Sequence, residues 1–209
     1  PGGDTDGGLN NNSLLRSFAL DRTNGSSYTF TGVLTWSAEA DRNNRQGLYL
    51  FGDSSIIPNE DEAGALSLHY QADAGQLRIA EGLDLNNNLA SVAATGAPAT
   101  DSYFTSVPLT FQADIAFVDN GGTDEIDVTF TLFNDFDGDS TFVSNTTSLT
   151  VLAADYTGSF FGFAGRVRDD GDGNSVTLYE SFAIIPEPST FLLVGLAGLG
   201  FLFFRRRHA

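Results

Sequence analysis

The chain has 209 residues and a net charge of −17, because 27 acidic residues oppose only 10 basic ones, and it contains no cysteine. Without cysteine the protein can form no disulfide and no thiolate metal site, and it cannot use thiol catalysis. A surface this acidic repels phosphate backbones, so we exclude nucleic acid as a partner. The same charge keeps a protein soluble and attracts divalent cations.

Short alternating segments dominate most of the chain. Residues 1–12 are mainly Gly, Asp and Asn, and we expect them to form a flexible leader. Beyond them, apolar and polar residues alternate in segments separated by turns rich in Gly, Asp and Asn, which is the pattern of half-buried strands. In the clearest segment, Tyr28, Phe30, Leu34 and Trp36 share one face. We expect strands at residues 13–20, 28–36, 47–51, 65–71, 76–81, 109–117, 125–133, 147–152, 160–168 and 175–184.

The same pattern assigns loops and faces. Residues 86–106 show no alternation, and we expect a long loop that is either functional or mobile. His69 falls on the polar face of its strand, so we expect it at the surface. It is the only histidine before the tail, so it has no partner for a zinc site and supports no Ser-His-Asp triad. In the last strand, the side chains expected to point inward are Val176, Leu178, Phe182 and Ile184.

No segment before residue 186 shows the 3.6-residue period of a helix. About ten short strands separated by turns indicate an all-β fold in which two antiparallel sheets pack as a β-sandwich. The order of these elements resembles the concanavalin A-like, laminin-G-like jelly roll. The resembling segments are Thr31–Trp36, Gly47–Gly52, Gly158–Val167 and a last strand that runs directly into Pro186. The resemblance implies that residues 13–185 form one jelly-roll domain.

The C-terminal tail, residues 186–209, joins a rigid polar break, an apolar run and a basic cluster. As a helix, the 14 residues of the run 191–204 reach about 21 Å, and flanking residues and snorkelling arginines bring the helix close to the ~30 Å hydrocarbon core. The positive-inside rule then keeps Arg205, Arg206 and Arg207 in the cytoplasm and the body outside. The alternative, a buried core helix, does not suit a run that ends in three arginines. The large side chains expected in the membrane are Phe191, Leu192, Leu193, Val194, Leu196, Leu199, Phe201, Leu202, Phe203 and Phe204.

This tail closely resembles the PEP-CTERM sorting signal of bacteria that make extracellular polysaccharide. The match comprises Pro186-Glu187-Pro188, the apolar run and the arginine cluster. The resemblance implies an exosortase as partner, a membrane-embedded enzyme similar to a cysteine transpeptidase, which cuts near the tripeptide. The protein is then anchored transiently in the inner membrane before it reaches the cell surface or the extracellular matrix. Because the two prolines fix φ and cannot continue a helix or a sheet ladder, we expect the motif to be extended and accessible.

One segment invites comparison with a catalytic strand. Glu125 and Asp127 resemble the start of the catalytic strand of jelly-roll glucanases of the laminarinase type, which carries Glu-hydrophobic-Asp-hydrophobic followed by a second Glu, with all three carboxylates on one face. Here Val128 and Thr129 follow, and neither can protonate a leaving group. We therefore predict a protein that is not an enzyme, with a glycan-active enzyme of the glucanase type as the alternative.

Two acidic loops are candidate Ca²⁺ sites, since carboxylate and amide oxygens spaced by two residues around glycine can converge on a hard cation. Neither loop matches an EF-hand, and turn preference explains both loops equally well. We expect no cofactor to be required, and Ca²⁺ binding would raise the unfolding temperature relative to EDTA. The candidate ligands are Asp135, Asp137 and Asp139 in one loop and Asp170, Asp172 and Asn174 in the other.

Taken in order, the sequence predicts a leader (1–12), a β-sandwich (13–185) and a sorting tail (186–209). We interpret the protein as a non-catalytic secreted or surface component, sorted by its tail and associated with extracellular polysaccharide or matrix through the rim of the sandwich. Sugar sites place exposed aromatic rings beside polar groups. Tyr49, Tyr103 and Tyr156 are candidates for such rings, although core roles explain them equally well.

Overall fold

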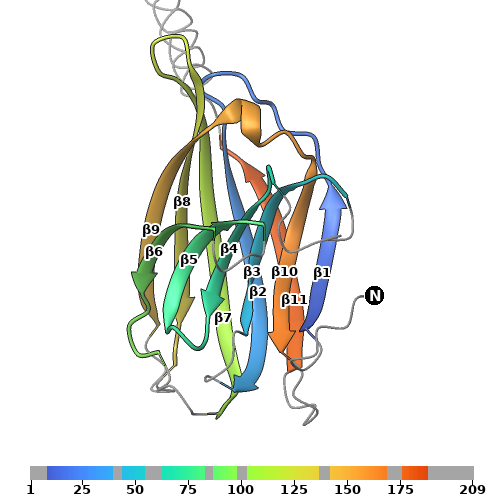
Figure 1. Ribbon diagram of the computed structural model, residues 1–209, viewed down its shortest axis with the longest axis vertical. Coiled ribbons are helices and arrows are strands. Elements are labelled where there is room, and N and C mark those ends of the chain that lie inside the picture. Colours follow the sequence, from blue (N-terminus) through green and yellow to red (C-terminus); the bar gives the residue numbers. More distant parts are fainter. Residues whose placement is uncertain are drawn as a thin grey trace, which may run out of the picture.

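The computed structural model describes residues 9–39, 44–54, 63–82, 87–97, 103–136, 142–168 and 176–187. In these ranges the chain forms two antiparallel sheets that pack face to face, which confirms the all-β sandwich (Figure 1). The six-stranded sheet consists, in spatial order, of β1 (Leu9–Ser17), β10 (Phe160–Arg168), β3 (Arg45–Gly52), β4 (Leu66–Gln71), β5 (Gln76–Glu81) and β6 (Asn88–Ala93). The five-stranded sheet consists of β11 (Val176–Pro186), β2 (Ser27–Glu39), β7 (Tyr103–Asp119), β8 (Asp124–Asn134) and β9 (Val143–Leu152). A 3₁₀ turn, η1 (Ala153–Asp155), follows β9.

Every expected strand is present, and the predicted pairing of 65–71 with 76–81 is confirmed as the β4–β5 hairpin. Two expectations about the connections are wrong. β1 begins at Leu9, inside the expected leader, because its backbone pairs with β10 from Leu9 opposite Arg168. The stretch 86–106 is not one long loop, since it contains β6 and the first residues of β7. Small residues fill β6, so its inward positions Ala90 and Val92 give only a faint alternation.

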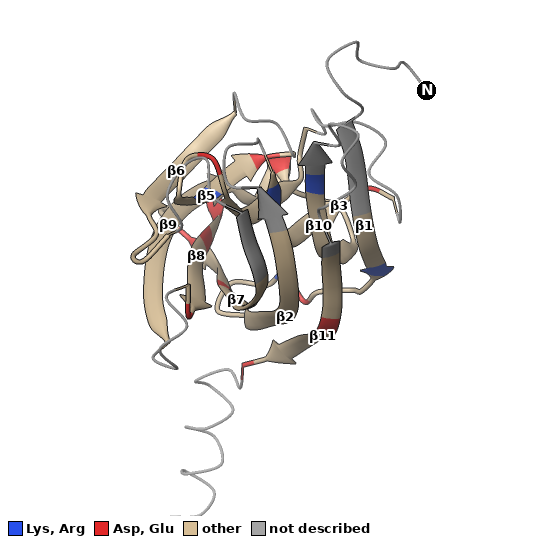
Figure 2. Ribbon diagram, turned by 90° about the horizontal axis from the view of Figure 1, so that it is seen from below, with Lys and Arg blue, Asp and Glu red and all other residues tan. Residues whose placement is uncertain are grey.

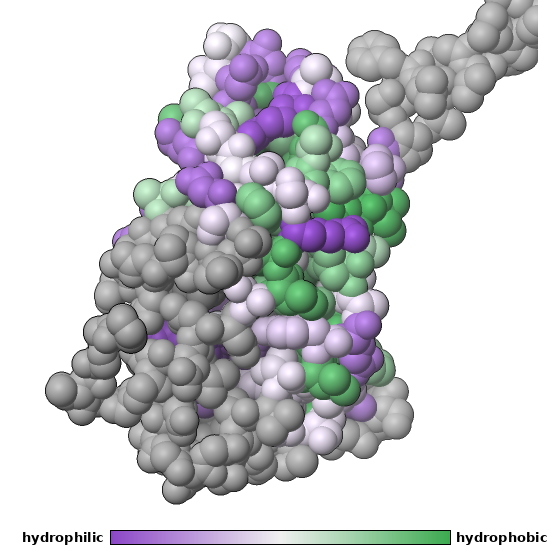
Figure 3. Space-filling view, turned by 90° about the vertical axis from the view of Figure 1, so that its right-hand side faces the viewer, coloured by the Kyte–Doolittle hydropathy of each residue, from purple (hydrophilic) through white to green (hydrophobic). Residues whose placement is uncertain are grey.

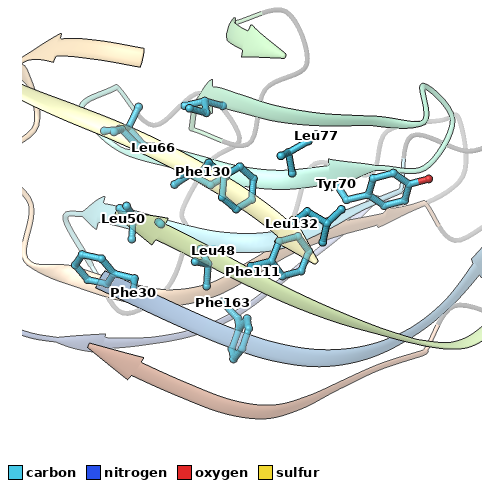
Figure 4. Close-up of a cluster of buried hydrophobic side chains, with 14 of the residues drawn as sticks. Phe30, Leu48, Leu50, Leu66, Tyr70, Leu77, Phe111, Phe130, Leu132 and Phe163 are labelled. Atoms are coloured by element: carbon cyan, nitrogen blue, oxygen red, sulfur yellow. The ribbon is translucent and has the colours of Figure 1, made fainter. Parts of the chain in front are cut away.

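The core lies between the two sheets and is built from aromatic and branched side chains of both (Figure 4). Phe30 of β2 stacks on Phe161 of β10 with ring centroids 5.3 Å apart, which joins one sheet to the other. Phe163 of β10 lies over Gly32 of β2, and a β-carbon at Gly32 would approach the Phe163 ring to 2.5 Å. Glycine is therefore required at this position, because only a missing side chain leaves space for the ring.

Strand β11 differs from the prediction because its regular alternation is interrupted. Its pairing with β2 shifts register between Tyr179 and Ser181, so two residues occupy the space of one. After this bulge Phe182 and Ile184 pack against the core as predicted. Before the bulge the inward and outward positions are exchanged relative to the prediction. Tyr179 stacks on Phe163 at 4.7 Å between ring centroids, and Leu178 is 60% exposed instead of inward.

The turns gather at two opposite ends of the sandwich because all neighbouring strands are antiparallel. β2, β4, β6, β8 and β10 end where β3, β5, β7, β9 and β11 begin, and we call this the loop end, at the bottom of Figure 1. β11 runs from the loop end to the opposite end, where Pro186 lies beside Tyr28 at the start of β2. We call this second end the motif end.

Among the described residues, acidic positions are spread over strands and turns of both sheets (Figure 2). Hydrophobic side chains gather on the side of the molecule where β1, β10 and β11 lie (Figure 3). Leu14 of β1 and Leu178 and Ile185 of β11 are among the exposed large hydrophobic residues of the described chain.

Candidate functional site

The first two residues of the proline-glutamate-proline motif belong to the folded body. Pro186 is the last residue of β11 and stands opposite Tyr28 in the register with β2. Since β11 is an edge strand, a proline without a backbone donor is tolerated there. The expectation that proline keeps the motif out of a sheet ladder is therefore wrong for Pro186. The backbone is nevertheless extended, and both Pro186 and Glu187 are exposed.

Glu187 is held to β2 through both its backbone and its side chain. Its backbone N–H donates to the carbonyl oxygen of Ser27 at 2.9 Å. The Thr29 hydroxyl lies 3.1 Å from Glu187 Oε1 and 2.5 Å from Asp114 Oδ1 on β7. Gln112 donates to the second Asp114 oxygen at 2.9 Å. The motif is therefore hydrogen-bonded to the body at the point where the chain leaves the sandwich, and it does not begin in a free linker.

A shallow groove of about 310 Å³ opens at this position. Residues of β2, β7 and β8 line it together with Glu187, which follows β11, and Asp114, Asp127 and Glu187 supply three carboxylates. We call it the motif groove. It lies at the motif end of the outer face of the five-stranded sheet, so the sorting motif and this face are continuous.

The rest of that outer face is rich in hydroxyl groups. Cross-strand pairs link neighbouring side chains: Thr131 lies 3.0 Å from Thr146, and Thr129 lies 3.3 Å from Ser148 between the hydroxyl oxygens. We define the hydroxyl face as the outward residues Thr31, Thr110, Gln112, Thr129, Thr131, Phe133, Ser144, Thr146 and Ser148.

One aromatic ring stands within this face. Phe133 alternates with the core residue Leu132, so it points outward, and it is half-buried. The register places Thr110 on one side of it and Ser144 on the other. An apolar ring flanked by hydroxyl groups is the kind of surface on which a sugar ring can stack while its hydroxyls form hydrogen bonds.

In β8, the strand that we compared with the glucanases, the side chains alternate between the two faces as predicted. Asp127 and Thr129 share the outer face, where Asp127 accepts a hydrogen bond from Thr150 at 2.6 Å. Glu125 accepts one from Asn120 at 3.3 Å. The alternation did not reveal Asp114, which reaches the same groove from β7 and carries no motif of its own.

Of the candidate Ca²⁺ ligands, only Asp135 lies within the described residues, directly after β8. Asp137, Asp139, Asp170, Asp172 and Asn174 fall in the segments 137–141 and 169–175, outside the described ranges. Among the residues that are described, no three His, Cys, Asp or Glu side chains are grouped so that they could hold a metal ion.

His69 is not a surface residue, since only 1% of it is exposed. It lies on the outer face of the six-stranded sheet, as the alternation predicted, but this part of the face is buried together with Ser67 and Gln71. Burial, reinforced by the positive charges of Arg45 and Arg78, lowers the pKa of His69 well below its ordinary value. The imidazole is therefore neutral, and its Nδ1 lies 3.0 Å from the Ser67 hydroxyl.

Two of the three candidate sugar-stacking tyrosines are not available for that role. Tyr49 and Tyr156 are both buried. Tyr156 packs near Phe51, and Tyr49 belongs to a small cluster with Ala65 and Ala164. The side chain of Tyr103 is outside the described part of the structure.

The expected membrane segment, residues 191–204, and Arg205–Arg207 lie outside the described ranges, as does Pro188. Within those ranges no helix is long and apolar enough to cross a membrane.

Comparisons with known proteins address the tail and the body separately. A search of curated proteins finds no match to the chain. Among solved structures, arcelin-5, a lectin-like defence protein from Phaseolus vulgaris, is 9% identical with a TM-score of 0.49, covering 87% of this chain and 80% of its own. The lectin UEA-II in complex with galactose is 12% identical with a TM-score of 0.45, covering 78% and 73%. An engineered GH43 glycoside hydrolase is 12% identical with a TM-score of 0.38, covering 75% of this chain and 29% of its own.

The tail is matched by a protein-family model. Residues 185–207 match the family described as the PEP-CTERM protein-sorting motif. This range begins at the next-to-last residue of β11, includes Pro186 beside Tyr28 and the hydrogen-bonded Glu187, and ends with the arginine cluster. The protein thus carries a PEP-CTERM sorting motif that begins inside the last strand of a β-sandwich.

Proposed function

We propose that the protein is a non-catalytic component of the cell surface, delivered by its PEP-CTERM motif and bound to extracellular polysaccharide through the hydroxyl face. The sorting motif implies export and a membrane-anchored sorting step by an exosortase. The observation that carries the second part of the proposal is the row Thr110, Phe133 and Ser144, which offers an apolar ring between two hydroxyl groups.

The charge of the body limits the kind of polysaccharide. Without residues 186–209, which hold three Arg and one Glu, the chain keeps 7 basic and 26 acidic residues, a net charge of −19. An anionic polymer would be repelled by this charge at low ionic strength. The proposal therefore specifies a neutral polysaccharide, bound by stacking and by hydrogen bonds to hydroxyl and amide groups.

A titration of the protein with polysaccharide from the native matrix tests this proposal. Phe133→Ala removes the ring and should weaken binding about fivefold, which corresponds to about 1 kcal/mol of stacking. Leu14→Ala, which removes an exposed apolar side chain from the other sheet, is the matched control and should bind as the wild type does. Equal loss in both variants, or no binding by the wild type at any salt concentration, would refute the proposed face.

One observation favours a glycan-active enzyme as the second candidate. Asp114, Asp127 and Glu187 line one groove, and a glycosidase needs two carboxyl groups on either side of a glycosidic bond. A general acid must also keep its proton near neutral pH, which usually needs a carboxyl in an apolar site. Asp127 and Glu187 are instead exposed and accept hydrogen bonds from threonine. Release of reducing ends from matrix polysaccharide, abolished by Asp127→Asn, would support the enzyme and contradict the non-catalytic proposal.

A further inference from the structure

The tripeptide Pro186-Glu187-Pro188 contains a single backbone donor, because proline has no N–H. That donor is the N–H of Glu187, and it is already bonded to the carbonyl oxygen of Ser27. An enzyme that binds an extended substrate through its main chain needs such a donor, as strand-addition recognition does. In the folded body, the only main-chain donor of the motif is therefore occupied.

The side chain of Glu187 is engaged as well. The Thr29 hydroxyl has one hydrogen, and it lies within hydrogen-bond distance of two carboxylates, Glu187 at 3.1 Å and Asp114 at 2.5 Å. The two acceptors compete for one donor, and their negative charges repel each other. Thr29 thus holds Glu187 against the body, while Asp114 opposes this contact.

We propose that the folded body holds the sorting motif in a latent form, and that the sorting enzyme recognises Glu187 only after its contacts with Ser27 and Thr29 open. Thr29 and Asp114 are then positioning residues: Thr29 favours the contact of Glu187 with the body, and Asp114 disfavours it. This inference rests on the proposed processing of the motif by an exosortase.

Opening of this kind needs no unfolding of the sandwich. The contacts of Glu187 lie directly after the last residue of an edge strand, and strand ends open locally far more easily than the core does. If only a fraction of molecules has the motif open, the apparent affinity for the enzyme falls by that fraction. A substitution that raises the open fraction should therefore speed processing without a change in the motif itself.

Pulse-labelling of the full chain in its native host measures the rate at which the tail is removed. Thr29→Val keeps the shape of the side chain and removes the hydroxyl, and it should speed processing about three- to tenfold, as expected for the loss of one hydrogen bond. Asp114→Asn removes the competing charge and should slow processing about twofold or more.

A matched control lies on the same two strands. Thr35 of β2 donates to Glu180 of β11 at 2.6 Å, so Thr35→Val also removes a threonine–glutamate bond between β2 and β11, but far from the motif. It should leave the processing rate unchanged. If Thr29→Val and Thr35→Val speed processing equally, general loosening of β11 explains the effect and the latch is refuted.

Hydrogen exchange of the Glu187 amide in the full chain in detergent separates this inference from the proposed function. We expect protection of this amide in the wild type, and faster exchange in Thr29→Val but not in Thr35→Val. An unprotected amide, or a rate of processing that Thr29→Val leaves unchanged or lowers, overturns the latch. If the wild type is never processed, the proposed function fails together with the latch, although protection of the amide would still stand as a structural fact.

Discussion

The contact between Gly32 and Phe163 predicts a coupling energy that can be measured. In Gly32→Ala the new β-carbon would lie 2.5 Å and 2.9 Å from two ring atoms of Phe163 and 2.7 Å from Leu48 Cδ2. Carbon atoms prefer about 3.5–4.0 Å, so the ring must move by about 1 Å, and overpacking of this kind costs about 1–3 kcal/mol. A smaller gain of about 0.4–1 kcal/mol, from the less flexible unfolded chain, offsets part of that cost.

Removing the ring should reverse the effect. Phe163→Ala alone should lower the free energy of unfolding by about 3–5 kcal/mol, because Phe163 is fully buried and packs against Tyr179 and Phe182 of β11. In that background Gly32→Ala meets only the flexible end of Leu48, so it should be neutral or slightly stabilising. The double variant should therefore be about 1–3 kcal/mol more stable than the two single effects predict when added.

Urea unfolding of a chain that ends at Glu187 measures the free energy of unfolding of the wild type, the two single variants and the double variant. Every described strand lies between Leu9 and Pro186, and Trp36, the only tryptophan, is buried and reports unfolding by fluorescence. A stabilising osmolyte, used at one concentration for all four proteins, keeps the weakest variant folded. If the two effects add within about 0.5 kcal/mol, the packing of Phe163 over Gly32 is not what holds the sheets together here.

Two further predictions concern a half-buried arginine and the titration of a histidine. Arg22 lies 5.4 Å from the ring centroids of both Phe51 and Phe117 and donates to the carbonyl oxygen of Tyr156, so Arg22→Gln should cost about 1–2 kcal/mol in thermal unfolding. Arg16, with one ring at 5.7 Å, is the control, and an equal loss in Arg16→Gln would contradict this account. The unfolded His69 takes up a proton near pH 6.5, whereas the folded one does so only at much lower pH. The stability that it contributes is therefore fully present above pH 6.5 and falls as the pH drops below that value. His69→Gln should lose less stability between pH 7 and pH 5, and an identical pH profile would show that His69 is not buried neutral.

The alternation of residues predicted strands wherever one face meets the core. β8 illustrates this success, since Ile126, Val128, Phe130 and Leu132 are all buried as expected. β6 was missed because its edge position needs few large apolar residues. The prediction that Leu178 points inward was wrong because the bulge at Glu180 exchanges the inward and outward positions of the strand. No local signal in the sequence indicates such an extra residue.

His69 and the motif show a second limit of sequence reasoning. Alternation assigns His69 to a face, but burial of that face depends on the rest of the chain. The motif itself is readable because its residues are adjacent in sequence. Its attachment to the body is not, since the Thr29–Glu187 contact joins residues 158 positions apart. Long-range pairing of this kind follows from topology and not from local pattern.

The mass of the mature protein recovered from the native cell surface shows directly whether the tail is a processed sorting signal. We expect a chain that ends near Pro186, Glu187 or Pro188, with or without an added group. A mature mass that still includes Arg205–Arg207 would mean that the tail is a permanent anchor, and it would contradict the account.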